Sequence, residues 1–167
     1  MSGDPSHDDL SRDDSHPRAR EALTDAFFWN PADPCGPFGD ETGREVLAAL
    51  RDFRVEEPRG KALDLLADLL ARWEIADESW DAIDADEVQA LGAADELGLL
   101  LRDEAILALV FAQIIVEGRA DPEVRRRALL AITRQSLPAL IHGWGDRARA
   151  RSEHLERMRA VLGQRWD

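Results

Sequence analysis

The sequence has one cysteine, one lysine and no tyrosine among its 167 residues. The single cysteine, Cys35, excludes an intrachain disulfide bond and fits a reducing compartment. The longest apolar stretch, Ile106 to Val116, has eleven residues, of which one, Gln113, is polar, whereas a bilayer-spanning helix needs about 20. The first twenty residues contain no apolar run, so we expect no signal peptide. These absences predict a cytoplasmic protein that does not bind a membrane.

Signatures of catalysis and of cofactor binding are also missing. The sequence has neither of the Gly-rich phosphate-binding patterns, no HExxH and no CxxC. Its acidic residues lack the spacing and the central glycine of an EF-hand. We therefore predict no catalytic residues, no cofactor and no metal site. A non-catalytic role is favoured, and an enzyme is kept as an alternative.

Acidic residues dominate the charge of the chain. The formal net charge is −13, and it is uneven, because residues 1–100 carry −16 and residues 101–167 carry +3. No basic residue occurs between Arg72 and Arg102. Since sequence-independent binding of nucleic acid depends on Lys and Arg that neutralise phosphates, this charge argues against a nucleic-acid partner. A surface of one sign suits a partner of the opposite sign.

The apolar residues recur at helical spacing, and this pattern predicts an all-α, single-domain bundle of about six helices. A central helix at 103–117, apolar nearly all round and about 20 Å long, is expected to be buried. Residues 1–17 are too polar to form a core, so they are predicted to be a disordered acidic tail in front of a helical domain at 18–167. The other expected helices lie at 18–28, 41–54, 61–75, 85–97, 122–137 and 147–162, with Asp40, Asp84 and Asp146 among the N-caps.

The acidic stretch at 74–96 has two interpretations, a solvated helix face or a docking surface for a basic protein partner. In the second, carboxylates meet Lys and Arg of the partner, and one tryptophan is the exposed anchor at the centre, while Trp73 packs in the core. The candidate partner-binding residues are Asp77, Glu78, Trp80, Asp81, Asp84, Asp86 and Glu87.

The loop at 28–43 is the alternative site. Its aromatic residues and the following helix N-terminus suggest a pocket for a small ligand. The competing interpretation is that these aromatics fill the end of the core while Asp40 caps a helix. The alternative pocket residues are Trp29, Phe38, Asp40, Glu41 and Arg44.

Two basic segments follow in the second half of the chain. The cluster Arg125 to Arg127, with Arg119 and Arg134 near it, is interpreted as a solvated helix face that pairs with the acidic half of the protein itself. The mixed charges of the last helix, Arg151 among them, are interpreted as exposed surface ion pairs.

Short motifs carry a family resemblance. The pair Phe28-Trp29, the turn Pro37-Phe38-Gly39-Asp40-Glu41-Thr42-Gly43 and the later stretch from Ala112 to Gly118 followed by Asp121 resemble the YfeS-like family of uncharacterised bacterial proteins. The likeness covers about residues 25–137, and the chain departs from the family in its long acidic N-terminal tail. The resemblance implies a compact bacterial cytoplasmic domain, and it supplies no catalytic residues.

The sequence therefore predicts a non-catalytic protein-binding domain that uses an acidic surface to bind a basic partner, such as an immunity protein that neutralises a bacterial toxin. An enzyme or small-ligand-binding domain with its pocket at the 28–43 loop is one alternative. A helical scaffold in the cytoplasm is another. Neither the identity of a partner nor the oligomeric state follows from the sequence.

Overall fold

The computed structural model describes residues 10–167 of the chain. These residues form eight α-helices and two short 3-10 helices, with no strand among them, so the all-α prediction is confirmed. The helices are α2 (Pro17–Ala22), η1 (Ala26–Trp29), α3 (Glu41–Glu56), α4 (Ala62–Arg72), α5 (Ala85–Ala94), α6 (Glu96–Glu117), α7 (Pro122–Gln135), α8 (Pro138–His142), η2 (Gly145–Arg147) and α9 (Ala148–Leu162).

Helix α6 is the buried centre of the fold. Its residues from Arg102 to Ile115 are all buried, as the absence of a polar stripe predicts. The predicted start at Asp103 was wrong, because the helix begins at Glu96 and has 22 residues, which makes it about 33 Å long. The cause is Asp95, whose carboxylate accepts a hydrogen bond from the Gly98 N–H at 2.9 Å and caps the helix there.

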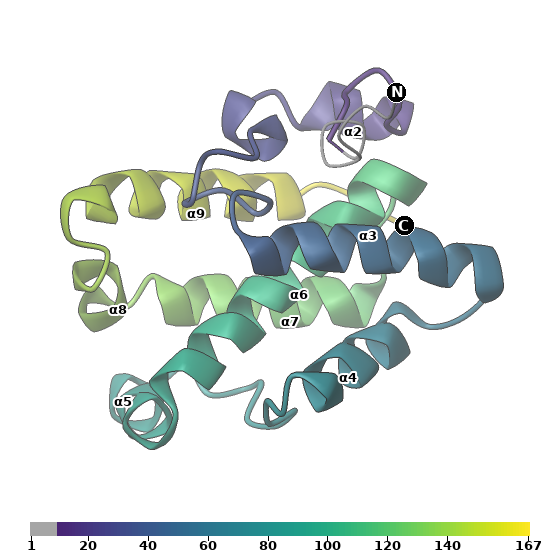
Figure 1. Cartoon of the computed structure of the whole chain (residues 1–167). Coiled ribbons are helices and arrows are strands. Elements are labelled where there is room, and N and C mark those ends of the chain that lie inside the picture. The colour runs from purple at the N-terminus through teal and green to yellow at the C-terminus, as the bar shows by residue number, and fades with distance from the viewer. Residues whose placement is uncertain (1–9) are drawn as a thin grey trace.

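The other helices surround α6 (Figure 1). Helices α3 and α7 make the most extensive contacts with it, and α2, α4 and α5 cover the rest, while α9 packs on α7 and α8. Helix α4 presents its predicted apolar face, Leu65, Leu66, Leu69 and Leu70, to this core. None of the helices in residues 10–167 combines the length and the apolar composition that crossing a bilayer requires.

The N-terminal segment is only partly described. Residues 1–9 of the predicted tail lie outside the described part of the chain. Residues 10–16, which the sequence assigned to the same tail, pack on the domain: Leu10 and Ser15 are buried, and the His16 N–H donates to the Ile115 carbonyl at 2.8 Å. Residues 10–16 thus contact the helical domain through Leu10, Ser15 and the His16 N–H.

Capping residues fixed several helix starts as predicted. The carboxylates of Asp40 and Asp84 accept backbone N–H groups from the first turns of α3 and α5. Asp146 was predicted to cap the last helix, and this was wrong, because it lies inside η2 and Arg147 occupies the N-cap of α9. The helix expected at 18–28 is interrupted after Ala22 and resumes as the single turn η1.

Two glycines of the 37–43 turn are required by close backbone approach. A Cβ at position 39 would lie 1.5 Å from the Asp33 carbonyl oxygen, and a Cβ at position 43 would lie 2.1 Å from that of Pro37. Both distances are far inside van der Waals contact. The turn that carries the family motif is therefore a place where backbone packs directly on backbone.

We predict that Gly39→Ala lowers the free energy of unfolding by about 1–3 kcal/mol, the usual cost of overpacking, because the loop must move to admit a methyl group. The matched control is Gly92→Ala inside α5, where a Cβ would meet only the Leu99 side chain at 3.9 Å. That control should gain up to about 1 kcal/mol from helix propensity. Urea denaturation measures both, and equal stability of the two variants would contradict the packing argument.

Candidate functional site

The acidic segment at 74–83 has no regular secondary structure, yet it has a defined shape. It connects α4 to α5, and its backbone takes positive φ at Glu74 and Ser79. Its centre is Trp80, which is 7% exposed and packs on the hydrophobic core. The prediction that Trp80 is an exposed anchor was wrong, whereas Trp73 packs against the core as expected.

Two guanidinium groups hold the Trp80 ring. The Arg102 guanidinium carbon lies 4.5 Å from the ring centroid and that of Arg127 lies 5.0 Å from it, both within cation–π distance. The indole N–H donates to the Asp77 carboxylate at 2.6 Å. The ring that the sequence offered to a partner is thus already bound within the chain.

Arg134 binds the backbone of the segment from the protein interior. Its side chain is fully buried, and it binds the Asp103 carboxylate through two nitrogens at 2.9 and 2.8 Å. The remaining terminal nitrogen donates to the backbone carbonyls of Trp80 and Ala82 at 3.1 and 2.6 Å. Arg134 was interpreted as part of a solvated face, and this was wrong. It sits three residues after the buried Ala131, on the face that α7 turns toward α6.

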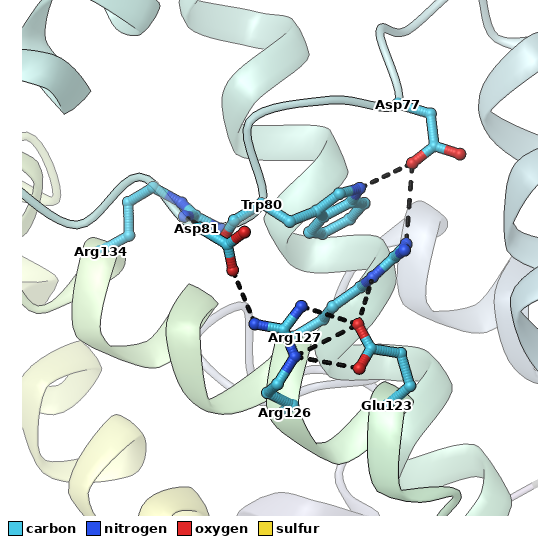
Figure 2. A network of polar contacts seen from close by, with 7 residues as sticks. All are labelled: Asp77, Trp80, Asp81, Glu123, Arg126, Arg127 and Arg134. Carbon is cyan, nitrogen blue, oxygen red and sulfur yellow. Dashed lines mark hydrogen bonds and ion pairs between the residues drawn. The ribbon is translucent and has the colours of Figure 1, made fainter.

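An outer layer of ion pairs joins the same segment to α7. Figure 2 shows Arg126 and Arg127 projecting toward it, where Arg126 pairs with Asp81 at 2.6 Å and Arg127 with Asp77 at 3.8 Å. Glu123 on α7 accepts hydrogen bonds from both arginines. The interpretation that this basic cluster pairs with the chain's own acidic half is confirmed for Arg126 and Arg127, whereas Arg125 donates to the Leu162 carbonyl and Arg119 pairs with Asp121. Arg126 and Arg127 neutralise part of the acidic stretch.

The remaining carboxylates of the predicted surface face solvent. Glu78, Asp84, Asp86 and Glu87 are exposed, and no ion pair within residues 10–167 engages them. Asp84 uses one oxygen to cap α5, with the Asp86 N–H at 3.0 Å. The candidate surface therefore divides into two parts, an inner part tied to arginines (Asp77, Trp80, Asp81) and an outer acidic edge (Glu78, Asp84, Asp86, Glu87).

The alternative site at the 28–43 loop is filled by its own side chains. Phe38 is fully buried, the Asp40 carboxylate caps α3 through the Gly43 N–H at 2.7 Å, and the Trp29 indole donates to the Leu23 carbonyl. Arg44 donates to the Pro31 carbonyl at 3.1 Å, and Glu41 is exposed in the first turn of α3. All five candidate residues thus serve packing, capping or the solvated surface, which agrees with the competing interpretation that the aromatics fill the end of the core while Asp40 caps a helix.

A buried charge pair lies beneath that loop. Arg151, fully buried, binds the Glu104 carboxylate and donates to the Cys35 carbonyl at 3.3 Å. Burial raises the pKa of the Glu104 carboxyl from its ordinary value of 4.5 to about 7, although the positive charge of Arg151 pulls in the opposite direction.

Arg151 was interpreted as an exposed surface charge, and this was wrong. It lies four and seven residues before the buried Leu155 and Met158. That spacing places it on the apolar face of α9. The spacing was the signal that could have identified it.

Removal of Arg134 tests how much its buried contacts with Asp103 and the acidic segment stabilise the fold. Arg134→Ala leaves Asp103 buried without its partner, and we expect unfolding free energy to fall by about 3–5 kcal/mol. The matched control is Arg126→Ala on the same helix, whose ion pairs are exposed and screened, so its stability should change little. Chemical denaturation compares the two. If both variants lose a similar unfolding free energy, the buried pair stabilises the fold no more than an exposed ion pair does.

Glu104 makes stability depend on pH. A carboxyl with a higher pKa in the folded chain keeps its proton there longer, so its contribution to stability is full below pH 4.5 and is lost as pH rises toward about 7. At about 1.4 kcal/mol per pKa unit, the loss is on the order of 3 kcal/mol. Glu104→Gln has no titrating group at this position, so the unfolding free energy of wild type minus that of the variant should fall by this amount across the range. Urea denaturation at both ends measures that difference, and a constant value would contradict the raised pKa.

Comparison with known proteins agrees with the motif resemblance. The chain is 29% identical over 133 residues to a protein of Escherichia coli (strain K12) named "Uncharacterized protein YfeS". The match covers 79% of this chain and 54% of that protein, so the chain spans about half the length of the curated relative it matches. No family model matches the chain, and no solved structure matches it. This similarity supports the resemblance to the YfeS-like family that the sequence motifs predicted.

Proposed function

We propose that the chain is a non-catalytic protein-binding domain whose acidic edge binds a basic partner protein, in the manner of an immunity protein that neutralises a bacterial toxin. The observation that carries the proposal is the preorganisation of the 74–87 region. An irregular, charged segment in solvent ordinarily loses conformational freedom when it binds. Here Trp80 and Arg134 have already fixed it.

The charge of the edge supports a basic partner. Four exposed carboxylates, Glu78, Asp84, Asp86 and Glu87, lie within ten residues and are free of ion pairs inside residues 10–167. The arginines of α7 neutralise only the inner part, Asp77 and Asp81. Complementary charge accelerates encounter and selects the partner, and it makes binding depend on salt.

The partner-binding residues are therefore proposed in two roles. Glu78, Asp84, Asp86 and Glu87 contact the cations of the partner. Asp77, Trp80 and Asp81 hold the segment in position through Arg126, Arg127 and the core, so substitution of the inner group acts on shape as well as on charge.

The test is a pull-down from a lysate of the native organism at low and high salt. Asp84→Asn, Asp86→Asn and Glu87→Gln are combined in one variant. Asparagine retains a good N-cap at position 84. The control variant neutralises Glu45, Asp52 and Asp68, exposed residues of α3 and α4, and so removes the same charge elsewhere.

We expect wild type and control to retain a basic protein that elutes as salt rises, with retention falling at least about tenfold in the edge variant. The control matters because both variants change the net charge of the molecule equally. If the edge variant keeps the wild-type salt dependence, or if the control loses binding to the same extent, this surface does not bind the partner.

A further inference from the structure

An apolar groove lies directly beside the acidic edge, between α5 and α8. It has a volume of about 620 Å³, and a second hollow of about 380 Å³ continues from it toward Trp144. Gly92, Glu96, Ala139 and Leu140 line both. Figure 1 places α5 and α8 at the same end of the bundle.

Helix α5 has an apolar face that no other part of residues 10–167 covers. It packs mainly on α6, and Val88 is its only buried residue. Ala85, Gly92 and Ala93 of the same helix line the groove instead. Two of the large exposed hydrophobic residues flank this helix, Ile83 with 43% and Leu97 with 63% of its surface in solvent. Apolar surface that gathers in one place and remains exposed is typical of an interaction site.

The charges around the groove are asymmetric. Glu96 lines the groove on the α5 side, and Asp84, Asp86 and Glu87 belong to the N-cap and first turn of α5, next to the lining residue Ala85. The opposite wall, from Leu137 to Leu140, contains no charged residue, and Arg147 closes the far end. An occupant that matches both features has an apolar stripe with cations along one flank.

We propose that this groove binds an amphipathic helix of the basic partner, with its apolar stripe between α5 and α8 and its Arg or Lys side chains against the acidic edge. The small residues Gly92, Ala93 and Ala139 allow close approach of a helix, as in other helix-in-groove complexes. This inference rests on the proposed function, to which it adds the apolar anchor that the buried Trp80 cannot provide.

A second copy of the chain is a poorer occupant. In a two-fold contact the same patch meets itself, so the carboxylates of one α5 would face those of the other. Like charges across an interface are destabilising. Charge complementarity therefore favours a different, basic partner over self-association.

The experiment measures binding of a fluorescent synthetic helix of about 12 residues, about 18 Å long, with leucines at i, i+3, i+4 and i+7 and arginines along one flank. A scrambled peptide of the same composition has the charge without the apolar stripe. The full chain is compared with Gly92→Leu, which fills the groove, and with Ala90→Leu, a control on the exposed side of α5. A Cβ at position 92 would meet only the Leu99 side chain, at 3.9 Å, so the fold should tolerate the larger side chain.

We expect the amphipathic peptide to bind at least about tenfold more tightly than the scrambled one, and Gly92→Leu to remove that advantage while Ala90→Leu keeps it. Ala93→Arg, at an exposed position of the groove, should weaken binding in the same way. This variant also serves if Gly92→Leu fails to fold.

The outcomes separate this inference from the proposed function. Equal binding of both peptides, sensitive to neutralisation of Asp84, Asp86 and Glu87 but not to Gly92→Leu, would overturn the groove and leave the acidic edge. Binding that needs the groove but ignores the carboxylates and salt would overturn the basic occupant and the proposed function together. Absence of binding, or a dimer of the chain that Gly92→Leu dissociates, would overturn the inference.

Discussion

The buried pair between Arg134 and Asp103 is the contact on which the surface of this protein depends. Two guanidinium nitrogens of Arg134 bind Asp103 and so join α7 to the central helix α6. The third nitrogen donates to the backbone of the acidic segment. Gln135 adds a hydrogen bond to the same carboxylate at 2.7 Å. A desolvated charge of this kind is tolerated only when its partners are complete. The core and the candidate binding surface are thus two sides of one polar network.

Local rules predicted much of the fold. Apolar periodicity located α3, α4, α6 and α7, and the caps at Asp40 and Asp84 were right because a capping bond needs only residues near in sequence. The start of α6 was missed because Asp95 is both the C-cap of α5 and the N-cap of α6. The two helices therefore follow each other without a loop that the sequence pattern could reveal.

The candidate site was harder to predict, because it depends on contacts between distant residues. Arg134 reaches Trp80 across 54 positions, and Arg151 reaches Glu104 across 47. A sequence pattern shows that Trp80 stands among acids, but not that two arginines cover its ring. Arg134 and Arg151 do lie three or four residues from buried apolar residues of the same helix. This helical spacing was the sequence feature that could have predicted their burial. Glu78, Asp84, Asp86 and Glu87 of the predicted surface are exposed, and their binding role remains a prediction.

Arg134 holds the acidic segment by the backbone carbonyls of Trp80 and Ala82, while its other two nitrogens bind Asp103 of α6. A backbone carbonyl is present whatever residue occupies the position. The side chains of Glu78, Asp86 and Glu87 can therefore be exchanged during evolution without loosening the contacts that hold the segment, whereas Asp84 also caps α5. In diverging relatives we expect the arginine–aspartate frame to persist while the acidic edge drifts, so that one scaffold can acquire new partner specificities.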